Sequence, residues 1–324
     1  MVSALLVQVA FGILFFPTSG LAQISQDALI PAGQKDLNDL RKRGFALLQK
    51  GAWSEANSVF EEILKQDKRD ELSLYGNSLA LFNLNRVSEA EENIKKAIGL
   101  LTEKGENSPL LPDALVLSGV ISATLHKNSE AVKALERAVG LAPEHFDANF
   151  SLARALFGNG DLVGAVRFFT KSVSIQPQNL KARFFLATAL ERKGDLEEAL
   201  KQYRLVVKQN PNYPEGNLGL GSLLIKTEGD SSADGLSALQ KAVGLNGNLY
   251  EAQILLGKTL VRLNRSDDAV PHLQKAAELA PENPEPHYQL ALAFRRIGKK
   301  KEAADEMAKV KKIHETRRGV KEND

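Results

Sequence analysis

The sequence of 324 residues predicts an all-α solenoid, because small residues return along it at a nearly constant spacing. Five of the seven intervals in the first set are 34 residues long, and the other two are 41 and 36. The members of this set are Gly44, Ser78, Gly119, Ala153, Ala187, Gly221, Gly257 and Ala291. Twelve residues after most of them comes an alanine: Ala56, Ala90, Ala131, Ala165, Ala199, Ala269 and Ala303. A fixed period of about 20 to 50 residues is typical of stacked helical or strand repeats.

Each repeat has the pattern of two amphipathic helices joined by a turn. In residues 180–213, an apolar face at helical spacing ends at Gly194, and a second apolar face begins at Leu196. A residue that tolerates positive φ stands at this break in most repeats, which favours a helix end there. The break residues are Gly51, Asn85, His126, Gly160, Gly194, Asn264 and Gly298.

The small residues also predict how the two helices of a repeat pack. Helix axes approach closely where one surface lacks bulk and a large side chain of the partner fills the space. A large residue follows each second small position by four residues, and we expect it to fill this space. These residues are Phe60, Ile94, Leu135, Phe169, Tyr203, Leu239, Leu273 and Met307.

The pattern resembles the tetratricopeptide repeat. The family's pair of Leu followed by Gly or Ala stands as Leu152-Ala153, Leu186-Ala187, Leu256-Gly257 and Leu290-Ala291, whereas Arg43, Asn77 and Ser118 replace that Leu in the first three repeats. The resemblance implies a right-handed solenoid of about eight helix-turn-helix repeats over residues 37–313. The expected repeats are 37–70, 71–104, 112–145, 146–179, 180–213, 214–249, 250–283 and 284–317, and residues 314–324 are expected to form a charged, disordered tail.

The N-terminus predicts export. Residues 1–16 carry no charge and include the apolar run 9–16, and Gly20 and Ala22 are small residues of the kind that a signal peptidase recognises. We therefore expect a signal peptide over 1–22, a flexible lead-in over 23–36, and a periplasmic or secreted protein. No Lys or Arg precedes the apolar run. An uncleaved N-terminal anchor and a cytosolic protein with an apolar start are the alternatives.

Composition argues against several function classes. The chain contains no cysteine, so disulfides, thiolate metal sites and cysteine nucleophiles are excluded, and its five histidines are scattered without metal-ligand spacing. The net charge of +2 favours neither nucleic acid nor membrane as a partner. We expect no enzyme activity, no cofactor, no metal and no stable membrane insertion of the mature chain. Residues 295–324 carry eleven Lys or Arg against six Asp or Glu, which indicates a polar cap or a docking site for an acidic partner or anionic surface.

The resemblance also implies where a partner would bind. In this family the first helix of each repeat lines a concave groove that usually holds extended peptides or helices. Transferring its inward-facing positions to this sequence gives Tyr75, Phe82, Val116, Phe150, Arg154, Phe157, Phe184, Arg192, Ile254, Lys258, Arg262, Tyr288 and Arg295. An apolar stripe with basic flanks suits a peptide with hydrophobic anchors and acidic groups. The alternative is that the aromatic residues pack neighbouring first helices against each other.

These observations predict an exported, non-catalytic scaffold that binds a peptide or protein partner. The family's carboxylate clamp for chaperone tails is not reproduced, because its first Lys and Asn positions hold Arg41 and Phe45. Two alternatives remain open. One is an envelope assembly or secretion accessory that acts through self-association or through its basic C-terminal end. The other is an accessory subunit of an enzyme complex.

Overall fold

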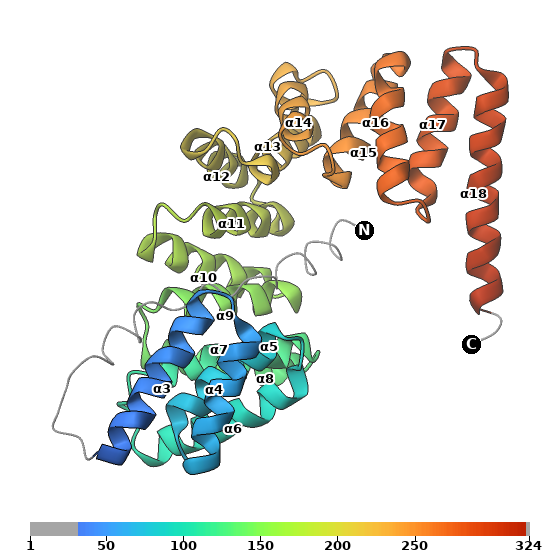
Figure 1. Cartoon of the computed structure of the whole chain (residues 1–324). Coiled ribbons are helices and arrows are strands. Elements are labelled where there is room, and N and C mark those ends of the chain that lie inside the picture. Colours follow the sequence, from blue (N-terminus) through green and yellow to red (C-terminus); the bar gives the residue numbers. More distant parts are fainter. Residues whose placement is uncertain (1–31, 322–324) are drawn as a thin grey trace. The chain divides into compact units, whose positions relative to one another are not determined.

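The computed structural model describes residues 32–321, and this part of the chain contains sixteen α-helices and no strand. The expected signal peptide and residues 23–31 of the expected lead-in lie outside the described residues. The chain divides after Pro177 into two compact units, called unit 1 and unit 2 below. Within each unit, consecutive helices pair as antiparallel hairpins that stack on one another (Figure 1). The all-α fold predicted from the sequence is confirmed.

Unit 1 contains four hairpins, each made of a first and a second helix. The pairs are α3 (Ala32–Gln49) with α4 (Trp53–Gln66), α5 (Glu71–Asn83) with α6 (Val87–Glu103), α7 (Leu111–Thr124) with α8 (Asn128–Leu141), and α9 (Phe146–Gly158) with α10 (Leu162–Ile175). Each second helix also packs against the first helix of the following hairpin within the unit. The apolar core therefore runs through unit 1 without a break, from Phe45 and Leu48 to Leu152.

Unit 2 repeats this arrangement. Its pairs are α11 (Leu180–Lys193) with α12 (Leu196–Gln209), α13 (Pro214–Glu228) with α14 (Ala233–Leu245), α15 (Tyr250–Arg262) with α16 (Ser266–Leu279), and α17 (Pro284–Arg296) with α18 (Lys300–Lys321). A core cluster centred on Leu256, Leu273 and Leu290 joins the last three hairpins.

The turns inside the hairpins form where the sequence predicts them. All seven break residues adopt positive φ: Gly51 (73°), Asn85 (62°), His126 (59°), Gly160 (85°), Gly194 (98°), Asn264 (59°) and Gly298 (81°). This conformation is open to glycine and tolerated by asparagine, so it ends the first helix and redirects the chain. In these seven hairpins the second helix begins two residues later.

Close helix packing in unit 1 depends on the predicted small residues. A Cβ atom on Gly44 would lie 2.7 Å from the Phe60 ring, and one on Gly76 would lie 2.4 Å from the same ring. Phe60 is fully buried between these two bare helix surfaces, which belong to successive hairpins. Gly119 opposes Leu135 in the same way, at 2.5 Å from its Cγ. The expected pairing of a small position with a large residue is therefore confirmed in unit 1.

Unit 2 uses the same contact, with one exception. Gly257 opposes Leu273 at 2.5 Å and Gly221 opposes Leu239 at 2.8 Å, measured from the Cβ that each glycine lacks. Met307, in contrast, is 45% exposed, so the expectation that it fills an interhelical space is wrong. The physical reason is that α18 is covered on one side only, because no further helix packs on it among the described residues.

The helices extend beyond the repeats that the sequence predicts at both ends. α3 begins at Ala32, inside the expected lead-in, and α18 continues to Lys321, so the expected disordered tail is corrected for residues 314–321. Val310 and Ile313, on α18 just before this extension, are buried. Further on, the Arg317 guanidinium donates a 2.6 Å hydrogen bond to the Glu282 carbonyl oxygen, which holds the helix against the preceding turn.

None of the helices among residues 32–321 combines the length and apolar character that crossing a membrane would require.

Candidate functional site

The structure places six of the expected groove residues on the first helices of unit 1. Tyr75 and Phe82 lie on α5, Val116 on α7, and Phe150, Arg154 and Phe157 on α9. Tyr75, Val116, Phe150 and Phe157 are buried, with between 3% and 9% of their surface exposed, and the other two are half-buried. In this unit most of the expected apolar stripe is therefore covered by protein.

The other seven expected residues lie on first helices of unit 2 and are more accessible. They are Phe184 and Arg192 on α11, Ile254, Lys258 and Arg262 on α15, and Tyr288 and Arg295 on α17. Phe184 is buried, Ile254 and Lys258 are half-buried, and the other four are exposed. Tyr288 has 43% of its surface in solvent, which makes it a large apolar contact point on a first helix.

The buried aromatic residues pack against neighbouring helices. The Phe150 ring lies 5.7 Å from the Phe169 ring in an edge-on arrangement. Phe184 has centroid distances of 5.9 Å to both Tyr203 and Tyr213. Such pairs stabilise helix contacts by about 0.5–1.5 kcal/mol beyond their buried area. These rings therefore serve the packing of the repeats, which was the alternative to a groove role.

Two of the basic residues expected beside the groove, Lys258 and Arg262, form ion pairs within unit 2. Lys258 Nζ lies 2.8 Å from Glu285 Oε1 on α17. The Arg262 guanidinium donates two hydrogen bonds of 2.6 Å to the Asp230 carboxylate. These pairs link α15 to the neighbouring hairpins. In unit 1, Arg154 lies 6.0 Å from the centroid of Phe150, and burial lowers the pKa of its guanidinium to about 10.

A buried hydrogen bond in unit 1 joins Asp113 and His145, which are not among the groove residues expected from the sequence. Asp113, on α7, is only 4% exposed and accepts a 2.8 Å hydrogen bond from Nε2 of His145. His145 precedes α9, and its Nδ1 accepts a hydrogen bond of 3.2 Å from the Ala148 backbone N–H. This acceptor role assigns the proton of the neutral ring to Nε2. Asp147 lies in the first turn of α9, and Tyr75 lies on α5.

Burial and neighbouring charges shift the pKa values of three of these groups. The hydrogen bond with Asp113 raises the pKa of His145. Burial raises the pKa of Asp147, an effect that Asp113 reinforces and His145 opposes. Burial and the charges of Asp113 and Asp147 hold the pKa of Tyr75 well above 10.0. The signal in the sequence was that Asp113 and Asp147 occupy the same position 34 residues apart, one turn before the buried Val116 and Phe150.

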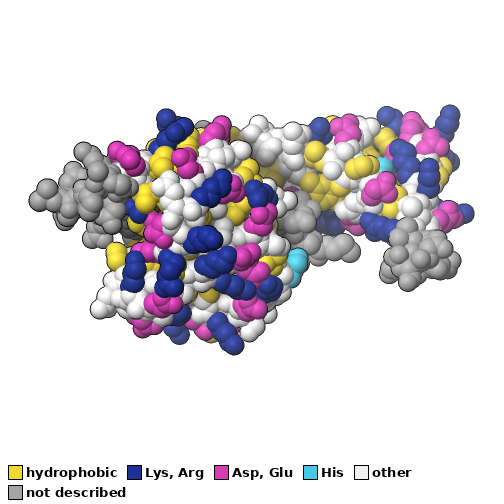
Figure 2. Space-filling view, turned by 60° about the horizontal axis from the view of Figure 1, so that its bottom comes forward, with side chains coloured by type: hydrophobic (Ala, Val, Ile, Leu, Met, Phe, Trp, Pro, Cys, Tyr) yellow, Lys and Arg dark blue, Asp and Glu magenta, His cyan; other side chains and the backbone are white. Residues whose placement is uncertain are grey.

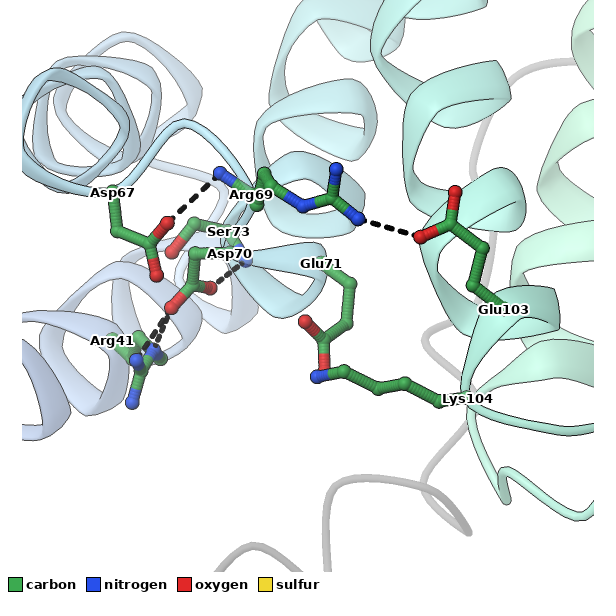
Figure 3. A network of polar contacts seen from close by, with 8 residues as sticks. All are labelled: Arg41, Asp67, Arg69, Asp70, Glu71, Ser73, Glu103 and Lys104. Atoms are coloured by element: carbon green, nitrogen blue, oxygen red, sulfur yellow. Dashed lines mark hydrogen bonds and ion pairs between the residues drawn. The ribbon is translucent and has the colours of Figure 1, made fainter.

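A second polar network surrounds a cavity of about 650 Å³ at the start of unit 1. Figure 3 shows Arg41 of α3 reaching across to Asp70, where its Nε donates a 2.6 Å hydrogen bond to Oδ2. The other oxygen of Asp70 accepts from the Ser73 N–H at 2.7 Å and caps α5. Two further ion pairs also line this cavity: Arg69 with Glu103, and Lys104 with Glu71.

The charges of this network compensate one another, so it joins the first two hairpins and leaves little charge for a ligand. Arg41 holds the position of the family's clamp lysine, and its guanidinium is occupied by Asp70 and Asn38. More widely, Figure 2 shows Lys or Arg and Asp or Glu side chains interspersed over the visible face. Within the described part of the chain, no three His, Asp or Glu side chains are placed to hold a metal ion.

Comparisons with known proteins agree with this architecture. Two family models, both described as tetratricopeptide repeat, match residues 156–223 and residues 123–179 with 254–316, about half of the chain together. The peroxisomal targeting signal receptor of Kluyveromyces lactis is 24% identical over 212 residues, which are 65% of this chain and 37% of the receptor. The chain therefore spans little more than a third of the length of this curated relative.

Solved structures show the same fold. The C-terminal part of a TPR repeat-containing protein from Cytophaga hutchinsonii covers 77% of this chain and 99% of its own, with a TM-score of 0.59 and 14% identity. A tetratricopeptide repeat protein from Parabacteroides merdae covers 80% and 99%, again with a TM-score of 0.59 and 14% identity. Proteins of this fold are generally non-catalytic scaffolds for protein–protein interaction. The repeated hairpins, their glycine contacts and these matches show that the chain belongs to the tetratricopeptide repeat family.

Proposed function

We propose that the chain is an exported, non-catalytic scaffold that binds a polypeptide partner on the surface formed by the first helices of its hairpins. The observation that carries the proposal is that polar side chains of successive first helices or hairpins contact one another. Lys258 pairs with Glu285 on the first helix of the next hairpin, and Asp113 accepts a hydrogen bond from His145 at the start of the next hairpin. Each unit thus presents a surface to which several hairpins contribute, as an extended partner requires.

The exposure of individual residues determines how this surface is best tested. Replacing Phe150, Phe157 or Phe184 by polar residues would disturb the core, because these rings are at most 9% exposed. Tyr288 on α17 is accessible without such a cost, and Leu245 on α14 is a control of similar exposure, at 38%, on a second helix of the same unit. A photoreactive phenylalanine analogue at each position therefore compares the two surfaces in equally folded proteins.

We expect light-dependent adducts with a specific host protein at position 288 and none of that protein at position 245. Equal adducts at both positions, or adducts at position 245 only, would reject the first-helix surface of unit 2 as the binding surface. Adducts consisting only of a second copy of this chain would favour self-association instead. Mass spectrometry of the crosslinked band distinguishes these outcomes.

Export is supported by the uncharged N-terminal segment with its apolar run 9–16. Its test is to fractionate the host cells and to sequence the N-terminus of the purified chain. Export with cleavage after Ala22 predicts Gln23 as the first residue, in the periplasm or the medium. A chain that retains residues 1–22 in the membrane fraction would support the anchor instead. Recovery of that uncleaved chain from the cytosol would overturn the proposal of export.

A further inference from the structure

The contact between the hairpin α3–α4 and helix α5 contains three buried polar atoms that have no hydrogen-bond partner among the described residues. They are Asn57 Oδ1 on α4, and Ser73 Oγ and Asn77 Oδ1 on α5. The three residues are at most 7% exposed. Buried polar atoms in folded proteins are nearly always paired, because an unpaired one loses its hydrogen bonds to water without replacement. This contact, called the first seam below, is therefore weaker than its apolar residues alone would make it.

The three residues surround the central packing contact of the first seam. The Phe60 ring of α4 lies against bare Gly76 of α5, where an added Cβ would be 2.4 Å from the ring. Asn57 precedes Phe60 by one helical turn and Ser73 precedes Gly76 by one turn, so each shares the helix face of that contact. Asn77 directly follows Gly76.

The corresponding positions elsewhere in the chain also face the neighbouring hairpin. Gly216 on α13 occupies the position of Ser73, and its missing Cβ would lie 2.6 Å from Val206 of the preceding helix α12. Glu91 occupies the position of Asn57, and it pairs at 2.6 Å with the lysine that precedes α8 in the following hairpin. The unpaired atoms of the first seam therefore belong to positions at which successive hairpins meet.

Later hairpins carry apolar residues at most of these positions, so stacking does not require polar ones. The position of Asn77 holds Leu152, Leu186, Leu220, Leu256 and Leu290 in the last five hairpins. The position of Ser73 holds Ala114, Ala148, Ala182 and Ala252 in four hairpins. The position of Asn57 holds Val132, Val166, Leu200, Leu236 and Val270 in hairpins three to seven.

One apolar and one ionic contact hold the first seam closed. Phe60 is fully buried between Gly44 and Gly76. Arg41 of α3 reaches across the seam to Asp70, and its Nε donates a 2.6 Å hydrogen bond to Oδ2 (Figure 3). The two side chains are 20% and 5% exposed, so salt screens this pair less than it screens a surface pair. The first seam therefore combines attractive contacts with unpaired atoms that oppose closure.

We propose that the hairpin α3–α4 is a lid, which opens from α5 as a unit and closes again through Phe60 and Arg41. Opening gives the three unpaired atoms hydrogen bonds to water. It leaves the later hairpins in place, because a hairpin in such a stack contacts only its neighbours. The open state uncovers the face of α5 around Gly76. This inference goes beyond the proposed function, since it requires no bound partner.

The ordinary explanation for a loose hairpin is its place at the end of a stack. Both α3–α4 and α17–α18 have a neighbouring hairpin on one side only among the described residues. The contact between α16 and α17, however, has Val270, Pro286 and Leu290 at the three positions that are polar in the first seam. If the end position alone governs opening, the two hairpins should open equally. If the unpaired atoms govern it, α3–α4 should open more.

Thiol labelling of the full-length chain measures opening, because the chain contains no cysteine of its own. Ser73→Cys places a thiol in the first seam, and Asn57 and Asn77 remain there. Ala114→Cys is the matched control at the same position of the next hairpin, and both replaced residues are fully buried. Each rate is divided by the rate in the urea-unfolded chain. We expect labelling at position 73 to be at least about tenfold faster than at position 114.

Two further substitutions, each combined with Ser73→Cys, test the cause of opening. Asn77→Leu introduces the residue of the later hairpins and should slow labelling by about tenfold, because an unpaired buried atom is removed. Asp70→Asn breaks the ionic contact and should speed labelling, whereas asparagine still caps α5. In the Ala114→Cys chain, neither substitution should change the rate.

Hydrogen exchange of the unsubstituted chain gives an independent measurement. A detached pair of helices is only marginally stable in water, so opening also lowers the protection of its backbone amides. We expect weaker protection in α3–α4 than in α17–α18. Leu290→Asn places a polar residue at the position of Asn77 in the last hairpin, and it should lower the protection of α17–α18.

Several outcomes would overturn the lid. Equal labelling at positions 73 and 114 would mean that both thiols react through global unfolding. Equal protection of α3–α4 and α17–α18 would leave the end position as the sole cause. A labelling rate that Asn77→Leu leaves unchanged or raises would show that the polar atoms do not favour opening. None of these outcomes bears on partner binding, so the scaffold function is tested separately.

Discussion

Units 1 and 2 are built by the same packing rule and differ in how they treat charge on their first helices. In unit 2, Lys258 and Arg262 are paired with Glu285 and Asp230 from neighbouring hairpins. In unit 1, Asp147 has no ion-pair partner among the described residues, and the expected groove residues are more deeply buried. The core contacts, in contrast, are equivalent, since a bare glycine faces a large side chain in both units.

The difference shows that helix packing and surface charge are set by separate residues. A small residue at one position brings two helices together, whatever charges stand on the exposed face. The polar positions are then free to differ between units. The following predictions test whether the cores are alike and the charged faces are not.

The largest expected effect comes from removing the side chains that fill the glycine contacts. Phe60→Ala should reduce the free energy of unfolding by about 3–5 kcal/mol, and Leu273→Ala by about 2–5 kcal/mol, because each leaves a cavity in a fully buried site. Native-state hydrogen exchange should show lost protection in α3–α6 for the first variant and in α15–α18 for the second. Losses below 1 kcal/mol would contradict the assigned contacts.

A smaller loss of stability is expected when a methyl group is added to a glycine at one of these contacts. Gly76→Ala places a Cβ 2.4 Å from the Phe60 ring, which cannot retreat because Gly44 lies against its other side. We expect a cost of about 1–3 kcal/mol by urea unfolding, despite the better helix propensity of alanine. Gly140→Ala is the control, since nothing lies within 4 Å of its Cβ, and it should stabilise the protein. Equal behaviour of both variants would mean that the contact is looser than described.

The smallest expected effect concerns the paired charges of unit 2. Lys258→Met should cost only about 0.2–1 kcal/mol, because the side chains of Lys258 and Glu285 are 33% and 42% exposed. Burial works against the charge on Glu285, but hydrogen bonds from Lys258 and Gln289 outweigh it and lower its pKa. The contribution is therefore present above about pH 4.5 and is lost as the pH falls through the lower, folded value. A loss above 2 kcal/mol at neutral pH would mark the pair as structural.

The repeat period predicted most of the fold, because contacts in a stack of hairpins connect positions at constant sequence distance. Counting residues along the repeat assigns Phe60 to Gly44 and Leu273 to Gly257. The same counting places His126 at a hairpin turn, where it adopts positive φ. Met307 could not be assigned in this way, since its exposure depends on whether another helix packs over α18. The extension of α18 past residue 313 also depended on a tertiary contact, between Arg317 and the Glu282 carbonyl.

The candidate site was less predictable for a different reason. Asp113 and His145 are 32 residues apart in the sequence and meet only when α9 is stacked beside α7. Hydrophobic periodicity carries no information about which polar groups find partners. Lys258 and Arg262 were correctly placed on first helices, yet their partners Glu285 and Asp230 lie 27 and 32 residues away in the sequence. Pairing of this kind is decided by side-chain reach in three dimensions.

The position of Phe60 between Gly44 and Gly76 has a consequence for how such a chain can lengthen during evolution. The ring belongs to one hairpin, but half of its cage is supplied by the hairpin that comes next. A gene duplication that inserts a copy is therefore tolerated only if the new hairpin brings its own small residue to the seam. Residues with little or no side chain are in this sense what makes the modules interchangeable.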